Sequence, residues 1–211
     1  AGMASYAIKA KKHVYVEKPM AKTIYEVRYL KDLAKKYNVV TQMGNQGHNT
    51  DGTRVTVEWI RSGVIGKIRE VHLSTDRPVW AQGNLTRPKG EKVPKTLNWD
   101  LWQGPAPEKP YSSTIVPFGW RGLWDYGTGA LGDMGAHIFD APIWALGLEL
   151  PVRINASTTA FNDEYLPLAE SVTYEFAARE SLGMPEVKVT WSDGGILPPR
   201  PDILPPGQRV Q

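Results

Sequence analysis

The sequence predicts an α/β segment followed by an α+β domain, with a partial parallel βαβ unit first and an open antiparallel sheet afterwards. In residues 1–50, runs with helical spacing alternate with short runs rich in β-branched side chains, which is typical of βαβ units. After residue 150, strand-like runs follow one another without helices between them, which favours an antiparallel sheet. This order predicts a nucleotide-type domain in residues 1–50 and an α+β domain in residues 51–211, with both domains incomplete.

The first segment carries two predicted helices and two predicted strands. Residues 4–12 have small and apolar side chains at helical spacing and then lysines, as at the end of a helix. Residues 13–17 are a β-rich run. The next helix begins after Thr23, which with Glu26 has the spacing of a capping box. Residues 39–43 are the second predicted strand.

The middle of the chain is less regular. Residues 52–62 have a helical pattern, and residues 68–75 alternate as a strand does. Residues 76–119 are rich in Pro, Gly, Trp and Lys, which predicts a long irregular excursion. Such loops usually bind or cover something. Residues 131–146 are predicted to form one helix.

The last part predicts a sheet and an irregular tail. Residues 152–160, 171–176 and 187–191 alternate apolar and polar side chains, so we expect three antiparallel strands. From Gly194 onward the chain is rich in proline and cannot form a helix. We expect an extended, poorly anchored end.

Composition excludes several classes of protein. The formal net charge is +3 and no Lys/Arg block is long enough to follow a phosphate backbone, so we expect no nucleic-acid partner. The absence of cysteine excludes disulfides and thiolate metal sites. No run approaches the roughly 18 apolar residues of a membrane span, so we expect no membrane partner. The sequence leaves the compartment open between cytoplasm and periplasm, since a leader would lie upstream of Ala1.

The tripeptide Glu17-Lys18-Pro19 follows the first predicted strand. In open α/β sheets, ligands bind beyond the carboxyl ends of the strands, where a lysine points its ammonium into the crevice. Such a lysine can favour the alkoxide that develops during alcohol oxidation, or carry a proton. The alternative is a solvent-facing charged turn.

Asp133 and His137 are four residues apart, so on a helix they share one face. The His137 imidazole can act as a general base on a substrate hydroxyl, while the Asp133 carboxylate orients a hydroxyl or the imidazole. Together with Asp140 the same side chains could instead bind zinc, manganese or iron, although we predict no metal. Asp133 could equally be a helix cap, and His137 an ordinary helix histidine.

Gly127, Gly129 and Gly132 match the spacing of the dinucleotide-binding glycine fingerprint. That fingerprint requires a buried strand before it and an acidic residue about 20 positions later. Residues 121–126 do not read as a buried strand, and position 153 is arginine, although Glu149 lies nearby. We therefore interpret the glycines as allowing the backbone to approach a ligand closely, and not as a pyrophosphate loop.

Two further runs combine polar and aromatic side chains. Residues 43–49 follow the second strand and include Gln46 and His48, which can meet a ligand at the strand end; a polar turn is the alternative. Residues 99–105 contain two tryptophans among polar side chains, which suit a sugar pocket or a loop packed over the sheet.

Taken together, these residues resemble the Gfo/Idh/MocA oxidoreductase family, which includes glucose–fructose oxidoreductase and inositol dehydrogenase. The family's Glu-Lys-Pro motif is matched at residues 17–19, and the strand before it at residues 12–16. The motif Gly-x-Leu-x-Asp-x-Gly-x-His-x-x-Asp is close to residues 129–140, with Asp133 and His137 in the key positions. The resemblance covers nearly the whole chain, and its motifs occur in the family's order.

The resemblance implies an N-terminal Rossmann domain that binds NAD or NADP, followed by an α+β substrate domain. It implies that Lys18, Asp133 and His137 are catalytic and meet near the nicotinamide and the reacting carbon. The implied cofactor-binding residues are Glu17, Lys18, Pro19, Gln46 and His48. The implied substrate-binding residues are Trp120, Arg121, Asp133 and His137.

The expected function is hydride transfer between NAD(P) and a hydroxyl carbon of a sugar or polyol. One alternative is oxidation at a ring carbon followed by elimination of a glycosidic bond, and another is a non-catalytic carbohydrate-binding or assembly module. Family members begin with a strand and a glycine-rich loop that are absent here, so we expect this chain to be an interior piece of a longer protein. We also expect a homo-oligomer formed through the antiparallel sheet when the protein is full length.

Overall fold

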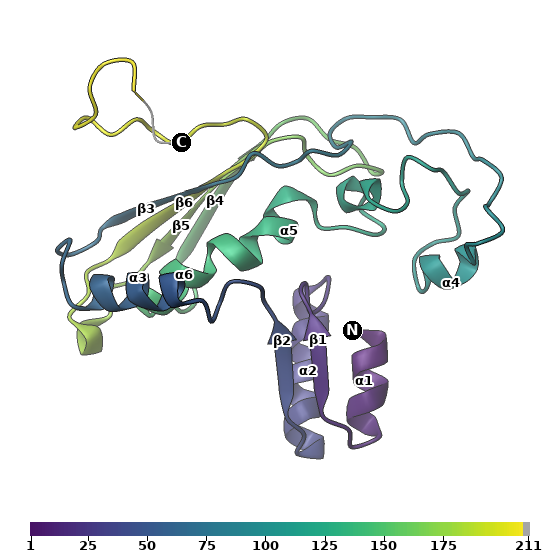
Figure 1. The fold of residues 1–211 in the computed structure, drawn as a ribbon, viewed down its shortest axis with the longest axis horizontal. Helices are drawn as coiled ribbons and strands as arrows, with labels where there is room; N and C mark the ends of the chain where they lie inside the picture. Colours follow the sequence, from purple (N-terminus) through teal and green to yellow (C-terminus); the bar gives the residue numbers. More distant parts are fainter. Residues whose placement is uncertain (209–211) are drawn as a thin grey trace. The chain divides into compact units, whose positions relative to one another are not determined.

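The computed structural model describes residues 1–208 and divides the chain into two compact units, residues 1–54 and residues 55–211 (Figure 1). The predicted fold class is confirmed, because a parallel βαβ unit is followed by a unit built on an open sheet. Helix α3 (Asp51–Arg61) begins in the first unit and ends in the second. No helix among residues 1–208 is long and apolar enough to cross a membrane.

The first unit contains two helices and two parallel strands, in the order α1 (Gly2–Lys9), β1 (Val14–Glu17), α2 (Ile24–Tyr37) and β2 (Thr41–Gly44). Buried Ile8, Leu30 and Leu33 form its core. Both carboxyl ends of the parallel strands therefore lie at the same edge of this small sheet.

The predicted capping box at the start of α2 is confirmed. The Glu26 amide donates to Thr23 Oγ1 at 3.2 Å, and the Thr23 amide donates to Glu26 Oε2 at 3.0 Å. These bonds satisfy amide groups that have no partner inside the helix, so the sequence sets the start of α2 locally. The helix ends at Tyr37, and the cap residue Asn38 adopts a left-handed conformation.

The second unit is organised around a four-stranded sheet in the order β3-β6-β5-β4. Its strands are β3 (Glu70–Ser74), β4 (Arg153–Thr158), β5 (Glu170–Phe176) and β6 (Val187–Ser192). The three predicted antiparallel strands pair as expected, and β3 adds a parallel neighbour to β6, so the whole sheet is mixed. Helices α3, α5 and α6 contribute apolar side chains to the core on one face of this sheet (Figure 1).

The helix predicted over residues 131–146 is two helices, α5 (Gly129–Ile138) and α6 (Asp140–Leu146). Pro142 explains the interruption at Phe139, because proline has no amide hydrogen to donate to the carbonyl of Ile138 and its ring crowds that carbonyl. The single-helix prediction was wrong at this point.

The excursion after β3 also contains local structure that the sequence pattern does not predict. Trp99–Gln103 forms a short helix, α4, whose first turn is capped by Asn98 Oδ1 accepting from the Leu101 amide at 3.0 Å. Gly119–Gly122 forms a 3-10 helix, η1. After β6, residues 194–208 form turns and irregular chain without a helix, and the last three residues of the predicted tail, 209–211, lie outside the described residues.

Candidate active site

The carboxyl end of β1 carries the Glu-Lys-Pro motif. The Lys18 amide donates to the Gly44 carbonyl at 3.1 Å, which continues the β1–β2 ladder beyond Glu17, and the Lys18–Pro19 peptide is cis. The Lys18 side chain is half-buried, whereas Glu17 and Pro19 are exposed. A Cβ at position 44 would lie 2.9 Å and 3.0 Å from the two Glu17 carboxylate oxygens, so glycine there lets Glu17 lie across β2.

Gln46 and His48 lie in the turn that follows β2, and both are exposed. Threonine hydroxyls fix this turn, since Thr50 Oγ1 and Thr53 Oγ1 each donate to the Gly47 carbonyl at 3.0 Å. The turn and the Glu-Lys-Pro motif follow the carboxyl ends of neighbouring parallel strands. The first unit therefore brings all predicted cofactor-binding residues to one edge of its sheet.

In the second unit, Asp133 and His137 lie one turn apart on α5 and are both half-buried. The Asp133 carboxylate forms an ion pair with Arg121, with Nε and Oδ1 3.4 Å apart. The two side chains are 18% and 25% exposed, so this pair is shielded more than an ordinary surface pair. The second unit thus pairs Arg121 with Asp133 and places His137 one turn away from Asp133 on the same helix.

Aromatic rings hold the Arg121 guanidinium. Its Cζ atom lies 4.4 Å from the Phe118 ring centroid and 4.6 Å from that of Trp120, with the Trp80 ring at 5.9 Å. Arg121 Nη1 also donates to the Phe118 carbonyl at 3.1 Å. Cation–π contacts of this kind fix a planar cation. Sequence reasoning missed Trp80 and Phe118, because no spacing rule links Trp80 to a residue 41 positions later.

Gly127, before α5, and Gly129 and Gly132, in its first turn, serve the chain's own packing. A Cβ on Gly127 would collide with the Arg121 backbone, and one on Gly132 would collide with the Thr128 side chain. Gly129 adopts φ +66° at the start of α5, a conformation that favours glycine. Residues 119–128 form η1 and turns before this helix. The interpretation that these glycines make room for a ligand is corrected, since chain atoms take up that space.

The described part of the chain offers no group of side chains that supports the alternative of a metal site. Asp140 belongs to α6, beyond the interruption at Phe139. Within residues 1–208, no group of three or more His, Cys, Asp or Glu side chains is placed to hold a metal ion.

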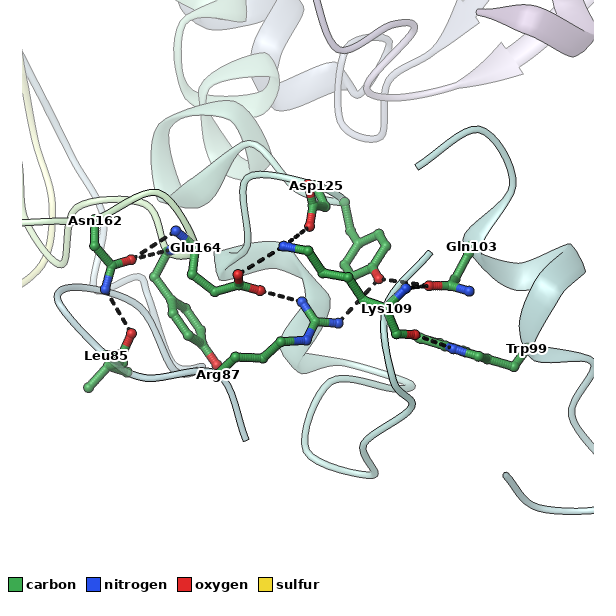
Figure 2. Close-up of polar contacts among 10 residues, drawn as sticks. Leu85, Arg87, Trp99, Gln103, Lys109, Asp125, Asn162 and Glu164 are labelled. Carbon is green, nitrogen blue, oxygen red and sulfur yellow. Dashed lines mark hydrogen bonds and ion pairs between the residues drawn. The ribbon is translucent and has the colours of Figure 1, made fainter. Parts of the chain in front are cut away.

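Two charged clusters in the second unit were not predicted. Arg87, Lys109, Asp125 and Glu164 form an ion-pair network (Figure 2). Although burial disfavours the charge of Lys109, its hydrogen bonds with Asp125 and Glu164 hold its pKa above the ordinary value. Burial would raise the pKa of Glu164, but hydrogen bonds from Lys109 and Arg87 hold it below the ordinary value.

The second cluster is a pair of carboxyl groups, from Glu170 at the start of β5 and from Asp193 directly after β6. Burial, with the nearby Asp193 carboxylate, raises the pKa of Glu170 to about 7. Asp193 is 1% exposed, and burial raises its pKa as well. Asp193 Oδ1 accepts from the Glu170 amide at 2.8 Å, and Oδ2 from Trp191 Nε1 at 2.9 Å. No sequence motif joins the two carboxyl groups, which only the β5–β6 pairing brings together.

Solved structures share this fold. The WlbA dehydrogenase from Chromobacterium violaceum, crystallised with NADH and UDP-GlcNAcA, aligns over 91% of the chain with 18% identity and a TM-score of 0.59. An aldose–aldose oxidoreductase from Caulobacter crescentus, complexed with glycerol, aligns over 90% with 18% identity and a TM-score of 0.57. An NAD-binding oxidoreductase from Klebsiella pneumoniae aligns over 91% with 21% identity and a TM-score of 0.57. The chain spans less than half of each of these proteins, between 44% and 46%.

Family models identify both units. The NAD-binding Rossmann fold of the GFO_IDH_MocA oxidoreductase family matches residues 1–45, and the C-terminal alpha/beta domain of that family matches residues 54–181. No curated protein matches the chain. Because the two family matches together cover most of the chain, in the order in which its two units occur, the chain belongs to the Gfo/Idh/MocA oxidoreductase family.

Proposed function

We propose that the chain is part of an NAD(P)-dependent oxidoreductase that transfers a hydride between the nicotinamide and a hydroxyl-bearing carbon of a sugar or polyol. The observation that carries this proposal is Asp133 held by Arg121 one helical turn from His137, in a chain that belongs to an oxidoreductase family. In this proposal residues 1–50 are the C-terminal part of the cofactor domain, and residues 51–211 are the substrate domain.

The residues at the carboxyl ends of β1 and β2 suit a dinucleotide. They offer an ammonium, a carboxamide and an imidazole beside a parallel sheet edge, which are suitable partners for ribose hydroxyls and a carboxamide. In the proposal, Glu17, Lys18, Pro19, Gln46 and His48 hold the nicotinamide end of NAD or NADP. When bound, the nicotinamide supplies the acceptor or donor of the hydride.

In the proposal, side chains of this chain carry out the proton transfer and bind the substrate. The Lys18 ammonium donates a hydrogen bond to the reacting oxygen and favours the developing alkoxide. An imidazole nitrogen of His137 takes the hydroxyl proton during oxidation and returns it during reduction. Asp133 accepts a hydrogen bond from a substrate hydroxyl, and Arg121 keeps its carboxylate in place. Trp120 offers a ring face to the sugar.

A sugar substrate is proposed on two grounds. The neighbours from Chromobacterium violaceum and Caulobacter crescentus carry names or ligands that are sugars or a polyol. In this chain, the Asp133 carboxylate and the aromatic rings around Arg121 combine a hydroxyl acceptor with apolar faces, a pairing that suits a sugar ring.

We also propose that the full protein is a homo-oligomer formed through the open sheet. Val187, Val189 and Trp191 of β6 are buried in the core, so Lys188 and Thr190 point to the other face. At one end of that face the strand register sets four charged side chains in a row of alternating sign. This row is Glu70, Lys188, Glu175 and Arg153. Light scattering on the full protein measures the oligomer, and a monomeric mass would reject this part of the proposal.

Cofactor reduction tests the proposed reaction. Purified protein that contains this chain is mixed with NAD⁺ or NADP⁺ and a panel of sugars and polyols, and NAD(P)H absorbance is followed. The proposal predicts NAD(P)H formation with at least one sugar or polyol. Release of free sugar from a glycoside without net NAD(P)H would indicate oxidation followed by elimination instead. Calorimetry that detects sugar binding but no cofactor binding would reject both reactions in favour of a binding module.

A further inference from the structure

Four charged side chains from distant parts of the second unit meet in one network. Lys109 Nζ lies 2.6 Å from Asp125 Oδ2 and 2.8 Å from Glu164 Oε2, and Figure 2 shows it between the two carboxylates. The other Glu164 oxygen pairs with Arg87 Nη1. Their side chains are between 15% and 26% exposed, so water screens them only partly. Glu164 is the one carboxylate that contacts both cations of this network.

The same network contacts aromatic and amide groups of the excursion. Arg87 Nη2 donates to the Tyr126 hydroxyl at 3.3 Å, and that hydroxyl donates to Gln103 Oε1 at 3.3 Å. The Lys109 amide also donates to Gln103 Oε1, at 2.8 Å, and Trp99 Nε1 donates to the Lys109 carbonyl at 2.7 Å. Helix α4 and the residues after it are thereby fastened to Tyr126.

Backbone contacts fix Glu164 from the other side. Asn162 Oδ1 accepts from the amides of Glu164 and Tyr165 at 2.9 Å, while Asn162 Nδ2 donates to the Leu85 carbonyl at 2.8 Å. The Glu164 carbonyl accepts from the Trp124 amide at 3.1 Å. Residues 162–165 and the excursion therefore enclose the segment 123–126 from two sides.

The enclosed segment joins the two parts of the candidate substrate site. The 3-10 helix η1, which contains Arg121, ends directly before it, and α5, with Asp133 and His137, begins shortly after it. The Gly127 amide donates to the Leu123 carbonyl at 2.8 Å, so a shift of residues 123–126 displaces the start of α5. A displacement of about 1 Å in reacting groups can cost on the order of 100-fold in rate.

We propose that Glu164 and Lys109 are positioning residues, which hold residues 123–126 so that Arg121, Asp133 and His137 keep their arrangement. This inference rests on the proposed function for its effect on turnover. It assigns no substrate contact to either residue. Loss of one partner leaves the remaining charges partly buried without compensation, so the segment moves to let them reach water.

The test compares four variants of the protein that contains this chain. Glu164→Gln and Lys109→Met break the network, Lys109→Arg keeps a cation with donors for both carboxylates, and Glu108→Gln changes an exposed neighbouring glutamate as the control. We expect Glu164→Gln and Lys109→Met to lower kcat about 10- to 100-fold, with KM for NAD(P) within about twofold of wild type. Lys109→Arg should restore most of kcat, and Glu108→Gln should leave it unchanged.

Several results would overturn the inference: unchanged kcat in both disrupting variants, a loss seen only in the cofactor KM, or failure of Lys109→Arg to exceed Lys109→Met. Hydrogen exchange separates this inference from the proposed function, because it needs no turnover. Glu164→Gln should speed amide exchange in residues 121–137, whereas Glu108→Gln should not. If the wild-type protein shows no turnover but Glu164→Gln speeds exchange in residues 121–137, the proposed reaction is wrong and the positioning role of Glu164 stands. If exchange is unchanged in Glu164→Gln, that positioning role is refuted.

Discussion

At the scale of single residues, the Asp133 carboxylate depends on a cation that is itself held by aromatic rings. Arg121 has Phe118 and Trp120 within 4.6 Å of its guanidinium carbon, and its Nη1 donates to a backbone carbonyl. A lysine at this position would keep the charge but lose the planar stacking and the fork of donors. The geometry of the ion pair therefore requires arginine and not merely a positive charge.

We expect Arg121→Lys to lower kcat/KM for the sugar about 10- to 100-fold, because the Asp133 carboxylate loses its fixed partner. Steady-state kinetics with the sugar that the wild-type protein oxidises measures the effect. Arg28→Lys, at an exposed position on α2, is the matched control and should behave as wild type. Normal kcat/KM in Arg121→Lys would show that Asp133 does not need this partner.

The carboxyl pair of Glu170 and Asp193 predicts a pH dependence of stability. The pKa of Glu170 is raised from 4.5 to about 7 in the folded protein, so between these values the folded state binds more protons than the unfolded state. The contribution of the Glu170 protonation to the free energy of unfolding should therefore be fully present below about pH 4.5 and be lost as pH rises through about 7. Allowing for partial solvent screening, the loss is about 2 kcal/mol.

Glu170→Gln removes this titration. Denaturant unfolding at a series of pH values should show a flatter dependence between pH 5 and about 7 than in wild type, with higher relative stability at the upper end. Glu149→Gln, at an exposed position, serves as the control and should retain the wild-type slope. A slope unchanged by Glu170→Gln would mean that Glu170 is already ionised in the folded protein at low pH.

At the scale of elements, local sequence rules decide where helices begin and break. The Thr23–Glu26 spacing predicts the start of α2, and the structure forms both bonds of the capping box. Pro142 is the residue in the sequence that indicates the break between α5 and α6, although the helical spacing of apolar residues continues across the break. Helix α4 was missed because it is five residues long in a proline-rich stretch, even though Asn98 is a recognisable cap.

The capping box gives an element-scale prediction. Thr23→Ala removes the hydroxyl that accepts from the Glu26 amide and should lower the free energy of unfolding by about 1 kcal/mol. Thermal or denaturant unfolding, followed by a signal from the first unit, measures this change in the free energy of unfolding. Lys31→Ala, at an exposed position in the middle of α2, is the control and should change stability by less than about 0.5 kcal/mol. Equal effects of the two substitutions would contradict a capping role.

At the scale of the whole molecule, the order of elements and the motifs predict the fold class and the family. Neither the order of elements nor the motifs predict which distant segments pair with each other. The parallel pairing of β3 with β6 joins residues 70–74 to residues 188–192, and the Glu164 network joins four separate segments. Hydrophobic period and turn chemistry act over a few residues, so they contain no information about these contacts. Spacing places Asp133 and His137 on one helix face, and the family resemblance adds Arg121 and Trp120, but no rule predicts the contacts of Arg121 with Trp80 and Phe118.

In the proposed reaction, Lys18 and His137 both take part in the chemistry at the substrate hydroxyl. A double-mutant cycle on kcat with Lys18→Ala and His137→Ala tests it most directly. We predict that each variant loses about 100- to 10,000-fold in kcat with little loss of stability, and that the double variant loses far less than the product of the two. Near-normal turnover in both single variants, or fully multiplicative losses, would contradict the proposal that the two residues act in the same step.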